Sequence, residues 1–301
     1  MPAAPAPEIR EALACLEAVL CRIASGAEGA SRGHFGLAYS GGMDSRFLAH
    51  AAHFLGFTPH LLMAVGPQIP PEEAQFGEGW ARRAGLPFRK VGVDTLSLPL
   101  VAANDLRRCY ECKRALLRRL LEALRDDGPG LPLCDGTNAS DALAYRPGTQ
   151  AVQELGVLSP LALAGLAKAD IYRLARLCGM ERPEQKPRPC LLTRLPYGMR
   201  PERGTLEALA AAERAVGLAL ESAGLPEADF RLRLVPQGEG SAALELHLLE
   251  KDAERLPPAL RGELPLLVAR AAPALPGPAR LAPQGTLSGF FDKQTEFPHS
   301  H

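Results

Sequence analysis

The chain has 301 residues, which is enough for one large domain and a smaller one. Its 34 basic and 34 acidic side chains cancel, so it lacks the overall positive field that gathers nucleic acid. The N-terminus has no cationic start followed by an apolar segment, and no stretch approaches the roughly 20 apolar residues of a membrane span. These features predict a cytoplasmic protein without a membrane partner and argue against a nucleic-acid partner.

Residues 1–30 predict a helix packed on the first domain, because apolar residues from Ile9 to Ile23 recur at steps of three and four. From 31 to 199, short apolar segments alternate with segments of helical period. Strands spaced by helices predict an α/β domain with a doubly wound, Rossmann-like parallel sheet. Its five strands are expected at 35–39, 60–65, 88–93, 131–134 and 157–158.

Residues 200–301 predict a smaller α+β domain for substrate binding or assembly. Five prolines between residues 182 and 201 indicate a rigid loop that leads into it. A helix is expected at 205–223, strands at 230–235 and 243–249, and a short helix at 265–271. The stretch after 272 is rich in proline and glycine, and its pattern predicts no element.

The sequence SGGMDS follows the first expected strand and precedes a helix. Gly41 and Gly42 let backbone N–H groups approach an anion, and the helix adds its unpaired donors and the positive end of its dipole. Ser40 and Ser45 supply hydroxyl donors. Asp44, an acid beside an anion, is expected to bind the Mg²⁺ that accompanies ATP. A simple glycine turn capped by a serine is the alternative interpretation.

A strand, this loop and a helix in that order resemble the PP-loop ATP pyrophosphatases of the adenine nucleotide alpha hydrolase superfamily. Those enzymes transfer AMP to a carbonyl or carboxylate oxygen and release pyrophosphate. The loop also lacks the Gly-Lys-Ser/Thr ending typical of loops that serve γ-phosphate transfer. The resemblance therefore implies ATP and Mg²⁺ as cofactors and an adenylylated intermediate.

Four further segments resemble one branch, the ATP-dependent sacrificial sulfur transferases of the LarE family, which act in nickel-pincer nucleotide cofactor synthesis. They are RCYECK at 108–113, DGTN at 135–138 with Asp141, YRPG at 145–148, and KPRPCLLTR through PYG at 186–198. The likeness runs from about residue 30 to residue 250. Two departures are Thr193, where a serine is usual, and the segment RLAPQGTLSGF at 280–290, which lacks an expected acid and arginine.

The resemblance implies that Cys190 donates the sulfur and that the residue is left as dehydroalanine. Its substrate would be a carboxylated pyridinium nucleotide activated as an acyl adenylate. Lys186, Arg188 and Arg194 are close in sequence and would favour the thiolate. Arg194 is accordingly expected to be catalytic and to contact substrate. A buried structural cysteine is the alternative for Cys190.

Other candidate binding residues come from both domains. Gly136 and Asn138 follow the fourth expected strand, at the edge where open α/β sheets bind ligands, although DGTN also suits a turn and helix cap. Arg146 is expected to clamp a phosphate. Arg231 and Arg233 should emerge from one face of a strand as a fork for a phosphate or carboxylate, unless that face is merely solvated.

Cys109 and Cys112 are spaced as metal ligands or a redox pair would be. Together with Cys190 they could hold an iron–sulfur cluster, while structural use, a persulfide and zinc remain open. The leading hypothesis is an ATP-dependent sulfur transferase acting on a small pyridinium nucleotide. A PP-loop tRNA thiolase with persulfide or Fe–S chemistry and a non-catalytic nucleotide-binding paralogue are the alternatives. Family analogy further implies a homo-oligomer.

Overall fold

The computed structural model describes residues 7–24, 33–127, 130–143, 147–185, 189–238 and 240–294. The chain forms two compact units, and the first contains residues up to 66, 71–95 and 107–188. The second contains 67–70, 96–106 and the residues from 189 onward. It therefore begins before the expected boundary at 199/200 and includes two short segments from within the sequence of the expected first domain.

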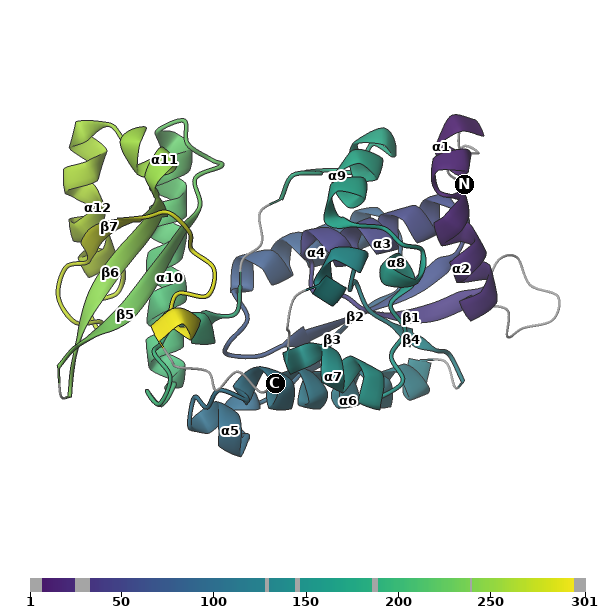
Figure 1. Cartoon of the computed structure of the whole chain (residues 1–301), viewed down its shortest axis with the longest axis horizontal. Helices are drawn as coiled ribbons and strands as arrows, with labels where there is room; N and C mark the ends of the chain where they lie inside the picture. Colours follow the sequence, from purple (N-terminus) through teal and green to yellow (C-terminus); the bar gives the residue numbers. More distant parts are fainter. Residues whose placement is uncertain are drawn as a thin grey trace. The chain divides into compact units, whose positions relative to one another are not determined.

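The first unit contains a parallel sheet with the strand order β3-β2-β1-β4 (Figure 1). Its strands are β1 (His34–Ala38), β2 (Thr58–Val65), β3 (Phe88–Gly92) and β4 (Leu133–Cys134). The predicted α/β class is confirmed, but the described residues form four strands rather than five. The fifth expected segment makes only a bridge between Leu158 and Cys134, because helix α8 begins at Pro160.

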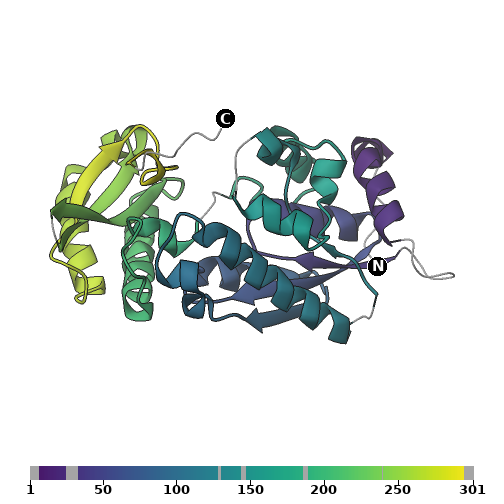
Figure 2. The same ribbon diagram turned by 60° about the horizontal axis from the view of Figure 1, so that its bottom comes forward.

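Helices cover both faces of this sheet, as a doubly wound fold requires. Phe35 and Leu37 point into one core, whereas Gly36 faces the other, where a Cβ would lie 2.4 Å from Leu124 Cδ2. The first core is covered by α2 (Ala14–Ala24), α3 (Met43–Phe54), α4 (Pro71–Arg83), α8 (Pro160–Leu163) and α9 (Lys168–Leu177). The second lies under α6 (Arg108–Asp127) and α7 (Pro147–Glu154) (Figure 2).

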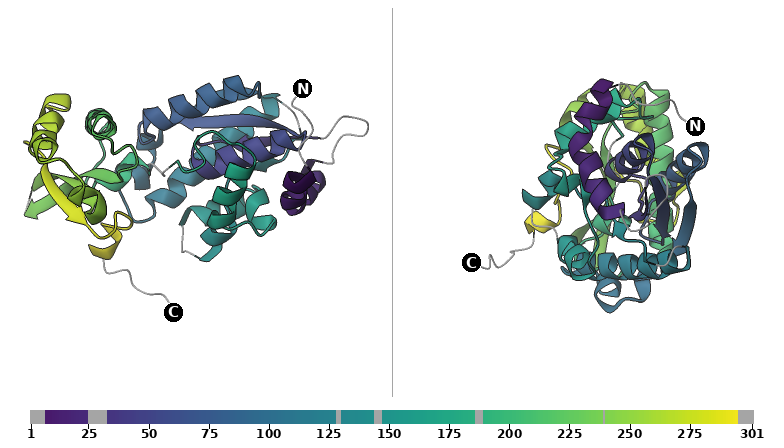
Figure 3. Two further views of the ribbon diagram at one scale, coloured as in Figure 1. Left: turned by 90° about the horizontal axis from the view of Figure 1, so that it is seen from above. Right: turned by 90° about the vertical axis from the view of Figure 1, so that its right-hand side faces the viewer.

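The N-terminal helical segment is divided into α1 (Pro7–Ala12) and α2, which are visible in the foreground of the right-hand view of Figure 3. Leu13, Leu16 and Leu20 are almost fully buried in the first core. Helix α2 contacts β1 and α8, so its apolar stripe is covered by the first unit. No helix among the described residues is both long and apolar enough to cross a membrane.

The second unit has the α+β character expected from its sequence, with the strand order β5-β6-β7. Strands β5 and β6 are antiparallel, and β7 joins in parallel. Arg231 and Arg233 alternate along β5 with buried leucines, so charges and leucines occupy opposite faces. The elements are α5 (Pro99–Ala102), η3 (Leu191–Arg194), α10 (Arg203–Ser222), β5 (Phe230–Gly238), β6 (Ser241–Leu249), α11 (Glu250–Glu254), α12 (Pro258–Ala271), β7 (Arg280–Gln284) and η4 (Asp292–Gln294).

Candidate functional site

The SGGMDS sequence forms a tight turn between β1 and α3 in the first unit. Gly41 has φ of +81°, a conformation that side chains with a Cβ rarely adopt. Gly42 is the N-cap residue of α3 and brings no side chain to the first turn, which starts at Met43. The backbone donors and the positive end of the helix dipole are thus directed at the turn, which is the arrangement of an anion site.

The two serine hydroxyls of the loop lie 3.1 Å apart. Ser45 Oγ accepts from the Ser40 N–H and donates to the Gly42 carbonyl, both at 3.2 Å. Ser40 Oγ accepts from the Gly42 N–H at 3.2 Å. These bonds hold the turn in shape and leave both hydroxyls beside the backbone donors, where phosphate oxygens would be bound.

Neighbouring segments approach the loop so closely that only glycine fits. A Cβ on Gly77 of α4 would lie 2.9 Å from Gly41 Cα. Tyr39 also donates its hydroxyl to the Gly77 carbonyl at 3.1 Å. A Cβ on Gly136, just after β4, would lie 2.8 Å from the backbone nitrogen of Ser45. The contact that the structure gives Gly136 is therefore with the backbone of the first turn of α3.

A lysine that sequence reasoning missed reaches the loop from α9. Lys168 Nζ lies 2.5 Å from Asp44 Oδ1 and 5.1 Å from the centre of the Tyr172 ring. Lys168 is the first residue of its helix, where the dipole disfavours a cation, and this unfavourable position was the available signal. The lysine places a positive charge beside the turn, as a phosphate site requires.

Asp44 is paired with Lys168 through Oδ1, so its other carboxylate oxygen is the one that would bind the predicted magnesium ion. Its side chain is 27% exposed and lies in the first turn after the loop. Mg²⁺ commonly takes only one or two protein carboxylates and completes its octahedron with phosphate oxygens and water. A single carboxylate beside an anion site therefore fits the ion.

The polar side chains of the DGTN turn after β4 bond to the turn itself and to neighbouring segments of the first unit. Asp135 Oδ1 accepts from the Thr137 N–H at 3.1 Å and from Ser159 Oγ at 2.8 Å. Asn138 is buried, and its Oδ1 accepts from the Ser140 N–H at 2.9 Å, at the start of a short 3-10 helix. In this structure Asn138 has the capping role that the sequence also allowed.

Arg46 connects the first turn of α3 to the segment after α9. The side chain is fully buried, and its Nη1 and Nη2 donate to the carbonyls of Glu181 and Arg182 at 2.8 and 3.0 Å. Arg46 Cζ also lies 4.8 Å from the centre of the Phe76 ring. The chain that leaves α9 in the direction of Cys190 is thus fastened to the helix that follows the loop.

Cys190 lies in the second unit, half-buried, immediately before η3. Its carbonyl accepts from the Thr193 N–H at 3.0 Å and from Thr193 Oγ1 at 2.8 Å. Arg194 is 1% exposed and donates from Nη1 to the Pro189 carbonyl at 3.2 Å. Its Nε and Nη2 each lie 2.8 Å from a carboxylate oxygen of Glu213. Bonds on both sides of Cys190 therefore fix its turn.

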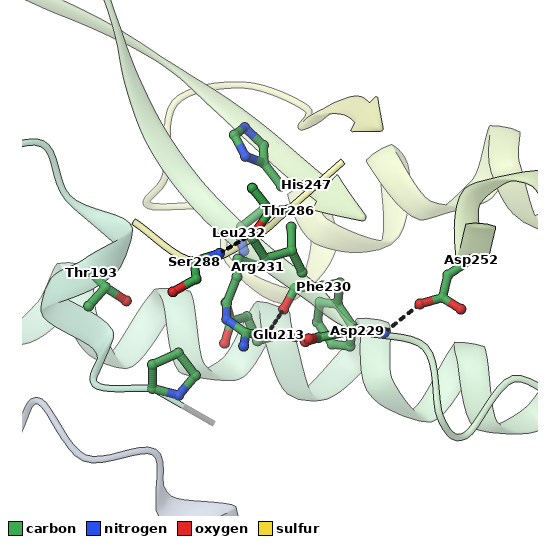
Figure 4. A network of polar contacts seen from close by, with 12 residues as sticks. Thr193, Glu213, Asp229, Phe230, Arg231, Leu232, His247, Asp252, Thr286 and Ser288 are labelled. Carbon is green, nitrogen blue, oxygen red and sulfur yellow. Dashed lines mark hydrogen bonds and ion pairs between the residues drawn. The ribbon is translucent and has the colours of Figure 1, made fainter. Parts of the chain in front are cut away.

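Glu213 is a second functional candidate that sequence reasoning missed. It comes from α10 and accepts the Leu232 N–H of β5 at 2.9 Å, in addition to Arg194. Figure 4 shows the Arg231 guanidinium beside it. One carboxylate thus connects the Cys190 turn to the strand that carries the two predicted arginines. The sequence signal was weak, because Glu213 stands next to Arg214 in a helix that also contains Glu207.

Arg231 and Arg233 share one face of β5, as predicted, but the face is not solvated: they are only 7% and 2% exposed. Arg231 binds the Asp229 carboxylate and donates to the Phe230 carbonyl at 2.6 Å. Arg233 Nη1 lies 2.8 Å from His247 Nδ1. Arg233 Nε is buried and has no hydrogen-bond partner among the residues the structure describes.

These guanidiniums form a cluster with more positive than negative charge. Burial, together with the nearby charges of Arg194 and Arg231, lowers the pKa of Arg233 to about 10, although the charges of Glu213 and Asp229 oppose this change. An anion would relieve this repulsion and accept from the Nε of Arg233. The cluster therefore has the charge and the donor that an anionic group needs.

The geometry does not support the roles predicted for three of the cations and for the cysteine pair. Arg146, Lys186 and Arg188 lie outside the described residues. Cys109 is exposed and Cys112 is buried on the first turns of α6. Within the described ranges, no group of three or more His, Cys, Asp or Glu side chains is placed to hold a metal. An iron–sulfur or zinc site is thus not formed by the described residues.

A parallel sheet with a glycine turn at the N-terminus of α3 is an α/β arrangement suited to binding a phosphate. No protein-family model matches the chain. It is 35% identical over 180 residues to the uncharacterized protein slr1717 of Synechocystis sp., covering 60% of this chain and 66% of that protein. It is 27% identical over 197 residues to the pyridinium-3,5-bisthiocarboxylic acid mononucleotide synthase of Lactiplantibacillus plantarum, covering 65% of this chain and 70% of the synthase.

The match with the synthase confirms the resemblance to the LarE family that the sequence motifs indicated. The chain spans only about two thirds of the length of these relatives. Among solved structures, an NMN synthetase from Francisella tularensis aligns with a TM-score of 0.43 and 15% identity, over 60% of this chain and 75% of that one.

The close approach of Gly136 to α3 predicts that Gly136→Ala damages the loop. The added methyl group would collide with backbone atoms of Ser45, so the first turn of α3 must shift. We expect a loss of about 1–3 kcal/mol in the free energy of unfolding and at least about tenfold weaker MgATP binding by calorimetry. Gly92→Ala is the matched control, because its Cβ meets nothing within 4 Å. Wild-type ATP affinity in Gly136→Ala would contradict this role.

The surroundings of His247 predict how the free energy of unfolding depends on pH. Burial lowers the pKa of His247, the hydrogen bond to Glu245 opposes this effect, and the Arg233 charge adds to it. The unfolded chain then binds more protons than the folded one below pH ~6.5, so the free energy of unfolding should decrease as the pH falls, by at most ~1.4 kcal/mol per pH unit. Urea unfolding at pH 7.5 and 5.5 should show a smaller loss for His247→Gln. Equal losses in both proteins would refute the prediction.

Proposed function

We propose that this chain is an ATP-dependent sulfur transferase that adenylylates a carboxylate of a pyridinium nucleotide and takes the sulfur from its own Cys190. The reaction would serve nickel-pincer nucleotide cofactor synthesis, as in the LarE family that the chain resembles. One observation carries the proposal beyond that resemblance. Arg194 holds the turn of Cys190 and also binds Glu213, beside an arginine cluster with an unpartnered donor.

The ATP half of the reaction would use the loop of the first unit. The backbone donors in the first turn of α3 and the two serine hydroxyls suit the oxygens of the pyrophosphate, while Lys168 supplies a positive charge near them. Mg²⁺ held by Asp44 would neutralise charge on the phosphates. These groups stabilise pyrophosphate as it leaves, which favours attack at the α-phosphorus.

The acceptor half would use the arginines of the second unit. A nucleotide phosphate or ring carboxylate would accept from Arg233 Nε and reduce the mutual repulsion of the three guanidiniums. Arg231 is expected to share this anion, and Arg194 to keep the sulfur donor in place. In this proposal Arg231 and Arg233 bind the anion, whereas Arg194 positions Cys190.

The proposed chemistry balances without an external oxidant or reductant. A carboxylate oxygen attacks the α-phosphorus of ATP, and pyrophosphate leaves. The Cys190 thiolate, having lost its proton to a base or solvent, attacks the acyl carbon, and AMP leaves with the electrons of the C–O bond. Removal of the Cα proton of Cys190 then breaks its Cβ–S bond, which yields a thiocarboxylate and dehydroalanine. Each chain would act once.

An intact-mass experiment tests this proposal. After incubation with MgATP and a bis-carboxylated pyridinium mononucleotide, the protein should lose about 34 Da, the mass of H₂S, at Cys190. Cys190→Ser should still release pyrophosphate but form no thiolated product, whereas Cys21→Ser, at an exposed cysteine of α2, should behave as wild type.

Other outcomes of that experiment identify the alternatives. Thiolated product with an unchanged mass and bound iron would contradict the sacrificial step and favour a cluster or persulfide involving Cys109 and Cys112. An unchanged mass with neither pyrophosphate nor product would favour a non-catalytic nucleotide-binding paralogue. Thiolation of tRNA in place of the mononucleotide would identify tRNA as the acceptor.

A further inference from the structure

His247 lies at the centre of a buried polar row on the second unit's sheet and was not singled out by the sequence. Its side chain is fully buried on β6. The Nδ1 atom lies 2.8 Å from Arg233 Nη1, and the Nε2 atom lies 2.9 Å from Glu245 Oε2. A guanidinium can only donate and a carboxylate can only accept. These partners therefore require a neutral ring with its proton on Nε2.

The row continues on both sides of the histidine. Arg280 of β7 contacts the other oxygen of Glu245, so that carboxylate is held from two directions. The Phe290 ring packs edge-on against His247 with ring centroids 4.5 Å apart, and Arg233 Cζ lies 4.8 Å from the centre of the same ring. His247 is thus fixed by β6, β7 and the segment that follows β7.

These contacts also determine which edge of the Arg233 guanidinium remains unbonded. Nη1 is bound to His247, Nη2 donates to the Leu287 carbonyl, and the aromatic face of Phe290 covers the plane. Nε alone has no partner among the described residues. Because the guanidinium is rigid and planar, holding the two terminal nitrogens fixes the direction of the Nε–H bond.

We propose that His247, held as its Nε2-protonated tautomer by Glu245, is a positioning residue that aims the Nε–H of Arg233 at an anionic group of the substrate. This inference rests on the proposed anion site and adds the residue that sets its geometry. The substrate class is a nucleotide bearing phosphate or carboxylate. His247 itself does not touch the substrate; it acts through Arg233.

Calorimetry with nicotinic acid mononucleotide, a carboxylated pyridinium mononucleotide, tests the proposal in the full chain. His247→Leu removes the acceptor for Arg233 and should weaken binding at least about tenfold, a change typical of lost alignment in a charged hydrogen bond. His247→Gln keeps one acceptor and one donor and should remain within about threefold of wild type. His34→Leu, at an exposed histidine of β1, is the matched control and should bind normally.

If His247→Leu does not fold, a spectroscopic measurement on the wild-type protein still tests the proposal. Nitrogen-15 NMR should show His247 protonated at Nε2, and the Arg233 Nε–H signal should shift when the mononucleotide binds. An Nδ1-protonated ring, an unshifted Arg233 signal, or normal binding by a folded His247→Leu would overturn the inference. Binding with this pattern but without sulfur transfer would instead defeat only the proposed function.

Discussion

The second unit depends on the ion pair between Arg194, which is buried, and Glu213, which is half-buried. Both carboxylate oxygens are paired with one planar guanidinium, and the same carboxylate accepts a backbone N–H of β5. Removing one partner of a buried pair typically costs about 3–5 kcal/mol, because the other charge is left uncompensated. The pair therefore joins the turn of Cys190, helix α10 and the arginine strand into one rigid arrangement.

The first unit is organised by close backbone contacts rather than by a charge pair. Gly77 and Gly136 let α4 and the segment after β4 approach the turn at Gly41 and Ser45. Such packing holds the loop in the shape of an anion site before any ligand is bound, which reduces the entropy lost on binding. Asp44 and Lys168 then add opposite charges at its rim. The two units thus prepare for anions by different physical means.

Local patterns in the sequence predicted the parts of this structure that local physics controls. The SGGMDS turn, the shared face of Arg231 and Arg233, and the α/β class all follow from strand and helix periodicity or from glycine chemistry. Lys168, Glu213 and His247 were not found in this way, because Asp44, Arg194 and Arg233, the charged partners that identify them, belong to other helices or strands. The fifth expected strand forms only a bridge, because α8 begins at Pro160 directly after that segment. The alternation of residues along β5 also did not predict that its arginine face is buried, because that burial depends on tertiary packing.

The proposed function depends on one step, in which a substrate carboxylate is activated by transfer of AMP before sulfur replaces its oxygen. The most direct measurement uses substrate labelled with ¹⁸O in its carboxylates and follows the phosphorus products by ³¹P NMR. We expect pyrophosphate and AMP with one ¹⁸O on its phosphorus, because the carboxylate oxygen that attacked ATP leaves with AMP. Unlabelled AMP, or ADP and inorganic phosphate in its place, would contradict it.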